Sequence, residues 1–250
     1  TNLSNMFLKA SSFNSNINNW DVSNVTDMSY MFYGQWSTSL YNQPMDNWNV
    51  SNVTNMSNMF RAATVFSQDL NSWNVSNVSN FSSMFSAASS FNGNISSWVP
   101  SSSTDTNGMF QGASGFVGDL SGWATHTGNI INMGGMFQQC PHNSNIGSWN
   151  VSSVTNMSYM FYGNFSVSNF NQDIGSWNVS SVTDMNNMFS GATAFNQNIG
   201  SWNVSNVANF ISFLQNGTSI NFSTTNLDAI YNGWDSRAVQ TPIVITFGSA

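Results

Sequence analysis

The stretch WDVSNVTDMSYMF at residues 20–32 decides the architecture of this chain, because close copies of it return along most of the sequence. Each copy fits the unit F-N-x-x-I-x-x-W-[DN]-V-S-x-V-T-x-M-x-x-M-F-x-x-A. The tryptophan of the unit recurs at intervals of 25 to 28 residues, at Trp20, Trp48, Trp73, Trp98, Trp123, Trp149, Trp177 and Trp202. One unit cannot close a hydrophobic core by itself, so neighbouring units are predicted to stack and bury their apolar residues in continuous columns.

Each unit is predicted to form one coil of a repeat solenoid over residues 1–215. The I-x-x-W-x-V part alternates apolar and polar residues, which predicts a short parallel strand. The M-x-x-M-F-x-x-A part has apolar residues three and four apart, which predicts a short helix or turn. All 14 methionines occupy repeat positions. They are therefore interpreted as adaptable core residues, not as metal ligands or a binding groove.

The last 35 residues depart from the repeat and are predicted to form a C-terminal helix-strand cap over 216–250. Thr224 or Thr225 is expected to begin a helix whose buried face carries Leu227, Ile230, Tyr231 and Trp234. Residues 243–247 are expected to form a final strand that covers the open edge of the last coil. At the other end, Thr1 aligns with Thr26, so the first coil is expected to be open, either as part of a longer protein or for closure by another copy.

The composition excludes several classes of function. Serine and asparagine contribute 44 and 41 residues, whereas charged residues make up only 5% and the formal net charge is −7. The three bases, Lys9, Arg61 and Arg237, are too few for a phosphate-binding surface, so no nucleic-acid partner is expected. No apolar run is long enough to span a bilayer, so no membrane insertion is expected within this segment.

Catalytic and metal-binding signatures are missing as well. All ten acidic residues are Asp, and they are accompanied by two His and one Cys. Nucleophile elbows, phosphate loops, zinc spacings and calcium loops do not occur, so we expect no enzyme, no metal and no cofactor. His126 and His142 are expected to be ordinary surface residues. Cys140 stands where other units carry Ala, and is expected to be a small buried thiol.

The residue after the repeat tryptophan is usually Asn or Asp, which tolerates turns and bonds to nearby backbone. This polar column on the sheet face of the stack is expected to be structural, with a polar ligand surface as the alternative. Its members are Asp21, Asn49, Asn74, Asn150, Asn178 and Asn203.

Two coils carry matching three-residue expansions that lie 129 residues apart, which indicates an ancient duplication of five coils. Each expansion adds an aromatic residue outside the core register, Trp36 or Phe165, next to Tyr33 or Tyr162. Aromatic residues on loops suit binding of a carbohydrate or a protein. Alternatively, these side chains fold back over the edge of the coil.

Residues 20–32 resemble the repeat of BspA-like bacterial surface proteins, a divergent branch of the leucine-rich-repeat class. The similarity covers residues 1–215, and residues 221–234 are similar to the closing segment that often follows such repeats. The resemblance implies a right-handed leucine-rich-repeat-like solenoid that is displayed outside the cell and takes part in adhesion or matrix contact.

The sequence therefore predicts an extracellular or cell- or virion-surface module that recognises a glycan or a protein. The alternative is a self-assembling structural protein of a fibre, sheath or virion surface, which associates through the open N-terminal coil or through its flat sides. A third possibility, ice binding, is disfavoured because the expected T-x-T lattice is absent. Asn164 and Asn216 are the glycosylation candidates, because their N-x-[ST] sequences lie outside the regular register.

Overall fold

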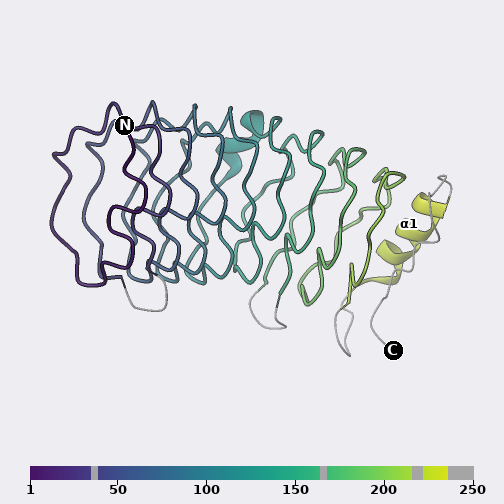
Figure 1. Ribbon diagram of the computed structural model, residues 1–250. Coiled ribbons are helices and arrows are strands. Elements are labelled where there is room, and N and C mark those ends of the chain that lie inside the picture. The colour runs from purple at the N-terminus through teal and green to yellow at the C-terminus, as the bar shows by residue number, and fades with distance from the viewer. Residues whose placement is uncertain (35–38, 164–167, 216–221, 236–250) are drawn as a thin grey trace.

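The computed structural model describes residues 1–34, 39–163, 168–215 and 222–235. Over these residues the chain winds into an elongated stack of coils that lie side by side in sequence order (Figure 1). One residue in each coil forms a parallel bridge with its equivalent in the next coil. The series runs Asn2, Asp27, Asn55, Asn80, Asp105, Asn132, Asn156, Asp184 and Asn209. The predicted stacking of the repeats is therefore present, with one repeat for each coil.

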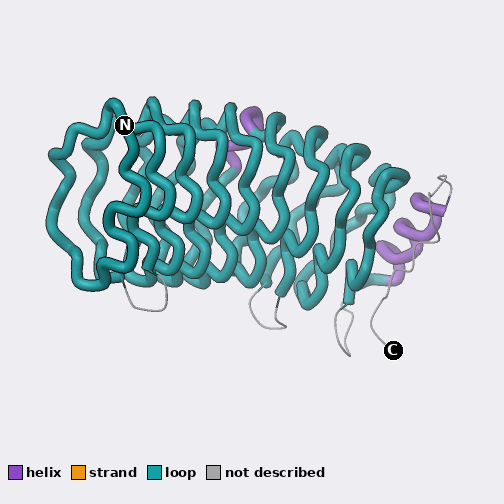
Figure 2. Tube along the Cα trace, in the orientation of Figure 1, coloured by secondary structure: helices purple, strands orange, loops and turns teal. Residues whose placement is uncertain are grey.

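The predicted internal structure of each coil is wrong. Within the described residues the bridges are isolated and no strand forms, and the helices are the 3-10 helix η1 at Ser121–His126 and the α-helix α1 at Thr224–Asp235 (Figure 2). A leucine-rich-repeat-like solenoid with a strand and a short helix in every coil is thus not what the chain forms. The polar column was predicted to lie on a sheet face, and this is wrong because the described residues form no sheet.

Backbone turns explain why the I-x-x-W-x-V segment does not become a strand. The N–H of Trp20 donates to the carbonyl of Ile17 at 3.0 Å, and the N–H of Val25 donates to that of Val22 at 2.9 Å. The same two turns recur in later coils, as at Trp73 with Leu70 and at Val78 with Val75. A chain that turns every three residues keeps its apolar side chains inward without forming an extended stretch.

A left-handed residue in each coil explains why the M-x-x-M-F segment does not become a helix. Two positions after the first apolar residue of this segment, φ lies between 54° and 61° in every coil. We call these positions the left-handed column: Asn5, Tyr30, Asn58, Ser83, Gly108, Gly135, Tyr159, Asn187 and Ser212. Alternate N–H groups then point along the stack, so that Met28 donates to Asn55 and Tyr30 to Ser57 of the next coil. An α-helix would need those groups for its own i−4 bonds.

The core is built from columns of aromatic rings, as the period predicted. Trp73 and Trp98 lie with centroids 6.3 Å apart and planes 5° apart, and Trp48 stacks on Trp73 in the same way. From Trp48 to Trp202, each repeat tryptophan donates its indole N–H to a backbone carbonyl of the coil before it, at 2.8–3.2 Å. This bond satisfies a buried donor and fixes the ring over its predecessor.

Methionine fills the space between the ring columns. Thirteen of the 14 Met residues are buried, as predicted for a core role. The exception is Met6, which is 49% exposed in the first coil, where Trp20 is also 38% exposed. These two residues lie at the N-terminal face of the stack, where the first coil has no described neighbour in front of it.

Helix α1 packs against the last complete coil at the other end of the stack (Figure 1). Trp234 is buried and donates its indole N–H to the carbonyl of Ile199 at 3.1 Å, so it continues the tryptophan pattern. The Ser223 hydroxyl caps the helix by accepting the N–H of Asn226, in place of the predicted Thr224 or Thr225.

The predicted buried face of α1 is correct only in part. Ile230 is buried together with Trp234, but Tyr231 is 55% exposed. The predicted strand at 243–247 lies outside the described residues, and the division of the chain at residue 215 stays a prediction. None of the described helices has the length and apolar character that a membrane crossing requires.

Candidate ligand-binding surface

Two pairs of tyrosines project from equivalent positions of two coils. Tyr30 and Tyr33 lie with ring centroids 5.8 Å apart in an edge-on arrangement, and Tyr159 and Tyr162 lie 5.6 Å apart with tilted rings. We call them the first and the second tyrosine pair. Tyr30 and Tyr159 are 37% and 36% exposed, whereas Tyr33 and Tyr162 are half-buried. Each pair therefore offers aromatic surface and phenol groups to solvent.

The backbone at Tyr30 and Tyr159 is unusual for such bulky residues. Their φ angles are 57° and 56°, and their N–H groups donate to the carbonyls of Ser57 and Asn186 in the next coil. Elsewhere the left-handed column contains only Asn, Ser or Gly. Asn and Gly tolerate this conformation best, while a side chain of ordinary bulk pays roughly 1–2 kcal/mol for it. Tyrosine occupies this column only in the two coils that carry an expansion.

The first pair has a cation beside it. The guanidinium carbon of Arg61 lies 5.7 Å from the ring centroid of Tyr33, and its Nη1 donates to Asn58 Oδ1 at 3.2 Å. A cation over an aromatic face at this distance attracts the ring and holds it in place. The second pair has Ser190 where the first has Arg61, since the carbonyls of these two residues accept the N–H groups of Gly34 and Gly163.

Two of the four tyrosines in these pairs were binding candidates in the sequence, and their role stays a prediction. Tyr33 and Tyr162 were predicted as binding residues and belong to the two pairs, but Trp36 and Phe165 lie outside the described residues. The glycosylation candidates Asn164 and Asn216 also lie outside them. Tyr30 and Tyr159 were missed. The repeated stretch SYMFYG at 29–34 and 158–163 could have revealed them, because other units place Asn, Ser or Gly at that position.

The polar column after the tryptophans is exposed, but its side chains serve turns. The Oδ1 atom of Asn49 accepts the N–H and the hydroxyl of Ser51, at 3.2 and 2.7 Å, and Asp21 accepts both groups of Ser23 in the same way. The bonds from Ser23 lower the pKa of the Asp21 carboxyl below its usual value. At Asn74, Asn150, Asn178 and Asn203 the Oδ1 atom likewise accepts the N–H two residues later. The column therefore favours the structural interpretation.

Asparagine ladders between coils do occur, but at a different corner of the coil. Asn42 donates its N–H to Asn14 Oδ1 at 3.0 Å, and Asn196 donates to Asn171 Oδ1 at 2.8 Å. Each of these four residues follows an aromatic residue of its unit, Phe13, Tyr41, Phe170 or Phe195. Because the Asn side-chain oxygens accept backbone N–H groups of the next coil, this corner is a structural seam between coils.

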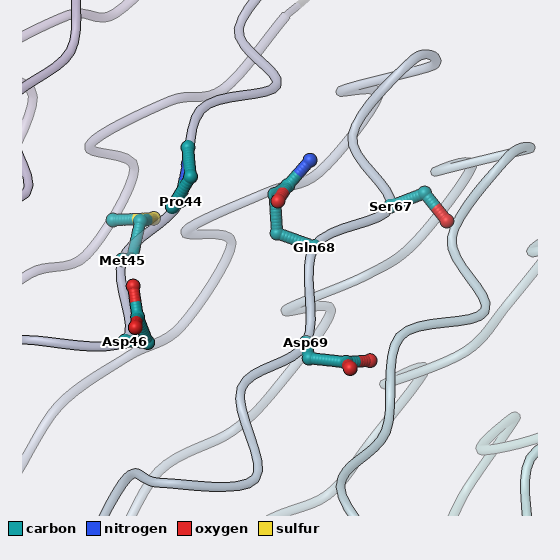
Figure 3. A pocket seen from close by; sticks show the side chains of 6 residues that line it. All are labelled: Pro44, Met45, Asp46, Ser67, Gln68 and Asp69. Carbon is teal, nitrogen blue, oxygen red and sulfur yellow. The ribbon is translucent and has the colours of Figure 1, made fainter.

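A shallow, open hollow of about 480 Å³ lies on the surface between two coils, lined by Pro44, Met45, Asp46, Ser67, Gln68 and Asp69 (Figure 3). Its two carboxylates are already engaged. Asp46 Oδ1 accepts the Asn18 amide at 2.7 Å, and Asp69 Oδ1 accepts the Asn94 N–H at 2.7 Å. The hollow therefore resembles the ordinary relief between coils more than a site built for a ligand.

Cys140 and His142 are buried in the irregular coil before the second tyrosine pair. The buried thiol of Cys140 was predicted correctly, and burial raises its pKa to about 12, so it is a poor nucleophile. The prediction of a surface position for His142 is wrong. Its ring is fully buried and stacks on Phe137 at 4.4 Å, because this coil lost one residue and His142 fills the place of Phe116 and Phe170 in their column. His126 is half-buried at the end of η1.

The described residues do not gather into a cluster suited to metal binding. No group of three or more His, Cys or Asp side chains there is close enough to hold a metal ion. His142 reaches only the hydroxyl of Ser144, through Nε2 at 3.1 Å, and its Nδ1 has no partner within the described part of the chain. The tyrosine pairs are thus the arrangement of exposed groups that departs most clearly from the repeat.

The architecture defines a tandem-repeat protein made of stacked coils. Residues 35–143 and, overlapping them, residues 119–227 each match the family described as "Mycoplasma protein of unknown function, DUF285". The chain belongs to this family, and the two tandem matches agree with its repeats. They do not confirm the assignment to BspA-like proteins. No curated protein and no solved structure matches the chain.

Proposed function

We propose that this chain is a non-enzymatic recognition module of the BspA-like type, displayed outside the cell, which binds a glycan through its two tyrosine pairs. The observation that carries the proposal is the presence of Tyr30 and Tyr159 in the left-handed column. A strained conformation held at an exposed, bulky residue is a known mark of functional sites. Here it occurs twice, at the same place in two coils, where the other coils carry Asn, Ser or Gly.

The chemistry of the pairs suits a carbohydrate. A tyrosine ring provides an apolar face for packing against the C–H groups of a sugar, and its hydroxyl can donate and accept hydrogen bonds. The pairs stand on a stack with a closely packed aromatic core, so binding costs little ordering of the protein. Adhesion through many weak glycan contacts needs this kind of preformed, exposed surface.

The proposal is tested by the double variant Tyr30→Asn/Tyr159→Asn on a glycan array. Asparagine is the natural residue of this column at Asn5, Asn58 and Asn187, so the variant keeps the backbone while removing the aromatic surface. Saturable binding by the wild type that is lost in the double variant supports the proposal. The matched control is Val117→Asn, which removes a 57% exposed apolar side chain at a corner where other coils carry Asn. Equal binding by the wild type and the double variant contradicts the proposal.

A second candidate function, assembly of copies into a fibre or sheath, is favoured by the low proportion of charged residues. Charged residues make up only 5% of the sequence, so little electrostatic repulsion opposes close packing of copies. Light scattering of the purified chain distinguishes growing filaments from monomers.

A further inference from the structure

The two tyrosine pairs are related by a simple shift along the stack. The bridge residues of their coils, Asp27 and Asn156, are joined by five parallel steps through Asn55, Asn80, Asp105 and Asn132. At about 4.8 Å for each parallel bridge, the bridge residues of the two coils lie roughly 24 Å apart along the stack. Because the two pairs occupy equivalent positions of stacked coils, they lie along the same edge of the stack.

The protein between the two pairs is closely packed. The phenylalanine column from Phe32 to Phe161 passes through Phe60, Phe85, Phe110 and Phe137 with ring centroids 5.5–5.9 Å apart. Every ring in this column is at most 2% exposed. A packed interior of this kind deforms little, so the spacing between the pairs is fixed by the fold.

The charged residues around the two pairs differ in sign. Beside the first pair stand Arg61, over the Tyr33 ring, and Lys9, whose N–H donates to the carbonyl of Tyr33, together with the bridge residue Asp27. Beside the second pair the charged residue is Asp184, the bridge partner of Asn156 in the next coil. A polyanion would therefore meet a carboxylate at the second pair, and a polycation would meet two cations at the first, so a neutral ligand suits both pairs.

Two sites of one kind, related by translation, match a ligand that itself repeats by translation. A folded protein partner presents a surface without such a repeat and would meet one pair at a time. We infer that the tyrosine pairs together bind one neutral, linear polysaccharide chain, which runs along the edge of the stack and engages both pairs at once. This inference rests on the proposed glycan-binding function and adds the ligand class and the bivalent mode.

Bivalent binding has a measurable signature. Once the first pair holds the polysaccharide, the second pair meets the same chain at a high effective concentration, which raises the overall affinity by about 10²- to 10⁴-fold over one site. A sugar too short to reach both pairs gains nothing and binds each pair independently.

The test compares short and long neutral glucans by titration calorimetry of the full chain. The probes are cellotriose with hydroxyethylcellulose, laminaritriose with laminarin, and maltotriose with amylose. For the linkage that binds, we expect two trisaccharides per wild-type chain and an affinity for the long glucan at least 10²-fold higher. Tyr30→Asn and Tyr159→Asn alone should each leave one trisaccharide site and reduce the long-glucan affinity to that of the trisaccharide, whereas Val117→Asn should change neither.

Four results overturn the inference, and they separate it from the proposed function. If trisaccharides bind but the long glucan binds no more tightly, glycan recognition stands and the bivalent mode fails. If the long glucan keeps its affinity in both single variants, the pairs do not act together. If none of the six probes binds and the glycan array shows only charged or branched glycans, the ligand is not a neutral linear polysaccharide. If the array is blank, the proposed function fails too, and a protein partner becomes the better hypothesis.

Discussion

The first and second tyrosine pairs share their backbone but differ in their neighbours. Both place a half-exposed tyrosine in a left-handed conformation and a second tyrosine three residues later, with the rings less than 6 Å apart. Only the first pair has a cation, Arg61, over one of its rings. After a duplication, features that a site needs are those expected to persist in both copies. Under the proposed function, the comparison predicts that the tyrosines contact the ligand and that Arg61 has a supporting role.

The largest expected effect is a loss of unfolding free energy when the packed coils between the two pairs are disrupted. Trp98 is buried, stacks on Trp73 and Trp123, and donates its indole N–H to Leu70 at 2.8 Å. Trp98→Ala leaves a cavity and an unpaired carbonyl, so we expect a loss of about 3–5 kcal/mol in unfolding free energy, measured by denaturant titration.

The matched control for Trp98→Ala is Trp20→Ala, which truncates the 38% exposed tryptophan of the first coil. It should cost about 1 kcal/mol, because much of its ring is already in water. An equal loss of unfolding free energy in the two variants would show that the stacked aromatic rings are not the main source of stability. Trp98→Ala should also reduce the long-glucan affinity more than the trisaccharide affinity.

The next effect is a pH dependence of the folding stability, which arises from His142 in the coil before the second pair. Burial among Phe116 and Phe137 lowers the pKa of His142 to about 3, an effect that the nearby Asp119 carboxylate only partly opposes. The unfolded imidazole takes up a proton below about pH 6.5, whereas the buried one cannot. Stability is therefore full above pH 6.5 and falls as the pH decreases towards 3, with a loss of about 2 kcal/mol between pH 7 and pH 5.

His142→Phe restores the phenylalanine of the column and should abolish this part of the pH dependence. The measurement is the midpoint of denaturant unfolding at pH 7 and pH 5 for the wild type and the variant. If both proteins lose the same stability on acidification, another group is responsible. The first pair, which lies several coils away, should bind cellotriose or its equivalent unchanged at pH 5.

A smaller effect concerns the strain that the two pairs share. Tyr30→Asn and Tyr159→Asn should each stabilise the folded chain by about 1 kcal/mol, since asparagine tolerates a positive φ better than tyrosine. The opposite substitution, Asn58→Tyr, places tyrosine in the same column without an expansion and should destabilise by a similar amount. Thermal unfolding of the three variants measures these differences. A loss of stability in both Tyr→Asn variants would show that the tyrosines are retained for packing.

The smallest effect tests one difference between the pairs. A cation over an exposed ring contributes about 0.5–1 kcal/mol, so Arg61→Ser should weaken the first pair by about two- to fivefold. The Tyr159→Asn background isolates the first pair, so that trisaccharide titration reports on that site alone. Ser190→Arg, in the Tyr30→Asn background, is the complementary variant and should strengthen the second pair. No change in either variant would leave Arg61 without a role in binding.

Some features of this molecule could be predicted from its sequence, and others could not. The period of the tryptophans predicted their stacking, and the position of Cys140 among alanines predicted its burial, because residues at equivalent positions of a repeat share one environment. The internal structure of the coil was predicted wrongly. Apolar residues three and four apart fit a helix, but they equally fit a series of turns that contains left-handed residues. Hydrogen bonds between coils decide between these two, and a single unit does not contain them.

The tyrosines of the candidate surface were recognised only in part from the sequence, for a similar reason. The two matching expansions adjoin Tyr33 and Tyr162, which made these two residues candidates. Tyr30 and Tyr159 stand where other units carry Asn, Ser or Gly, and nothing in one unit alone marks them as special. Their strain depends on φ, which follows from the bonds of each coil to the next. His142 was misplaced because the loss of one residue before it moves it into the phenylalanine column, a change of register that depends on how the coil closes.

The amino-acid sequence by itself determined that this chain is a stack of equivalent units, which residues of each unit face inward, and where two units differ from the rest. These features follow from burial of the same positions in every unit, and the interval between the units can be read directly from the sequence. Tertiary structure alone decided that the coils contain turns in place of strands and helices, and that two tyrosines hold a conformation suited to asparagine or glycine. The physical reason is that backbone N–H and C=O groups take their partners from neighbouring coils, so the local conformation is fixed only when the coils stack.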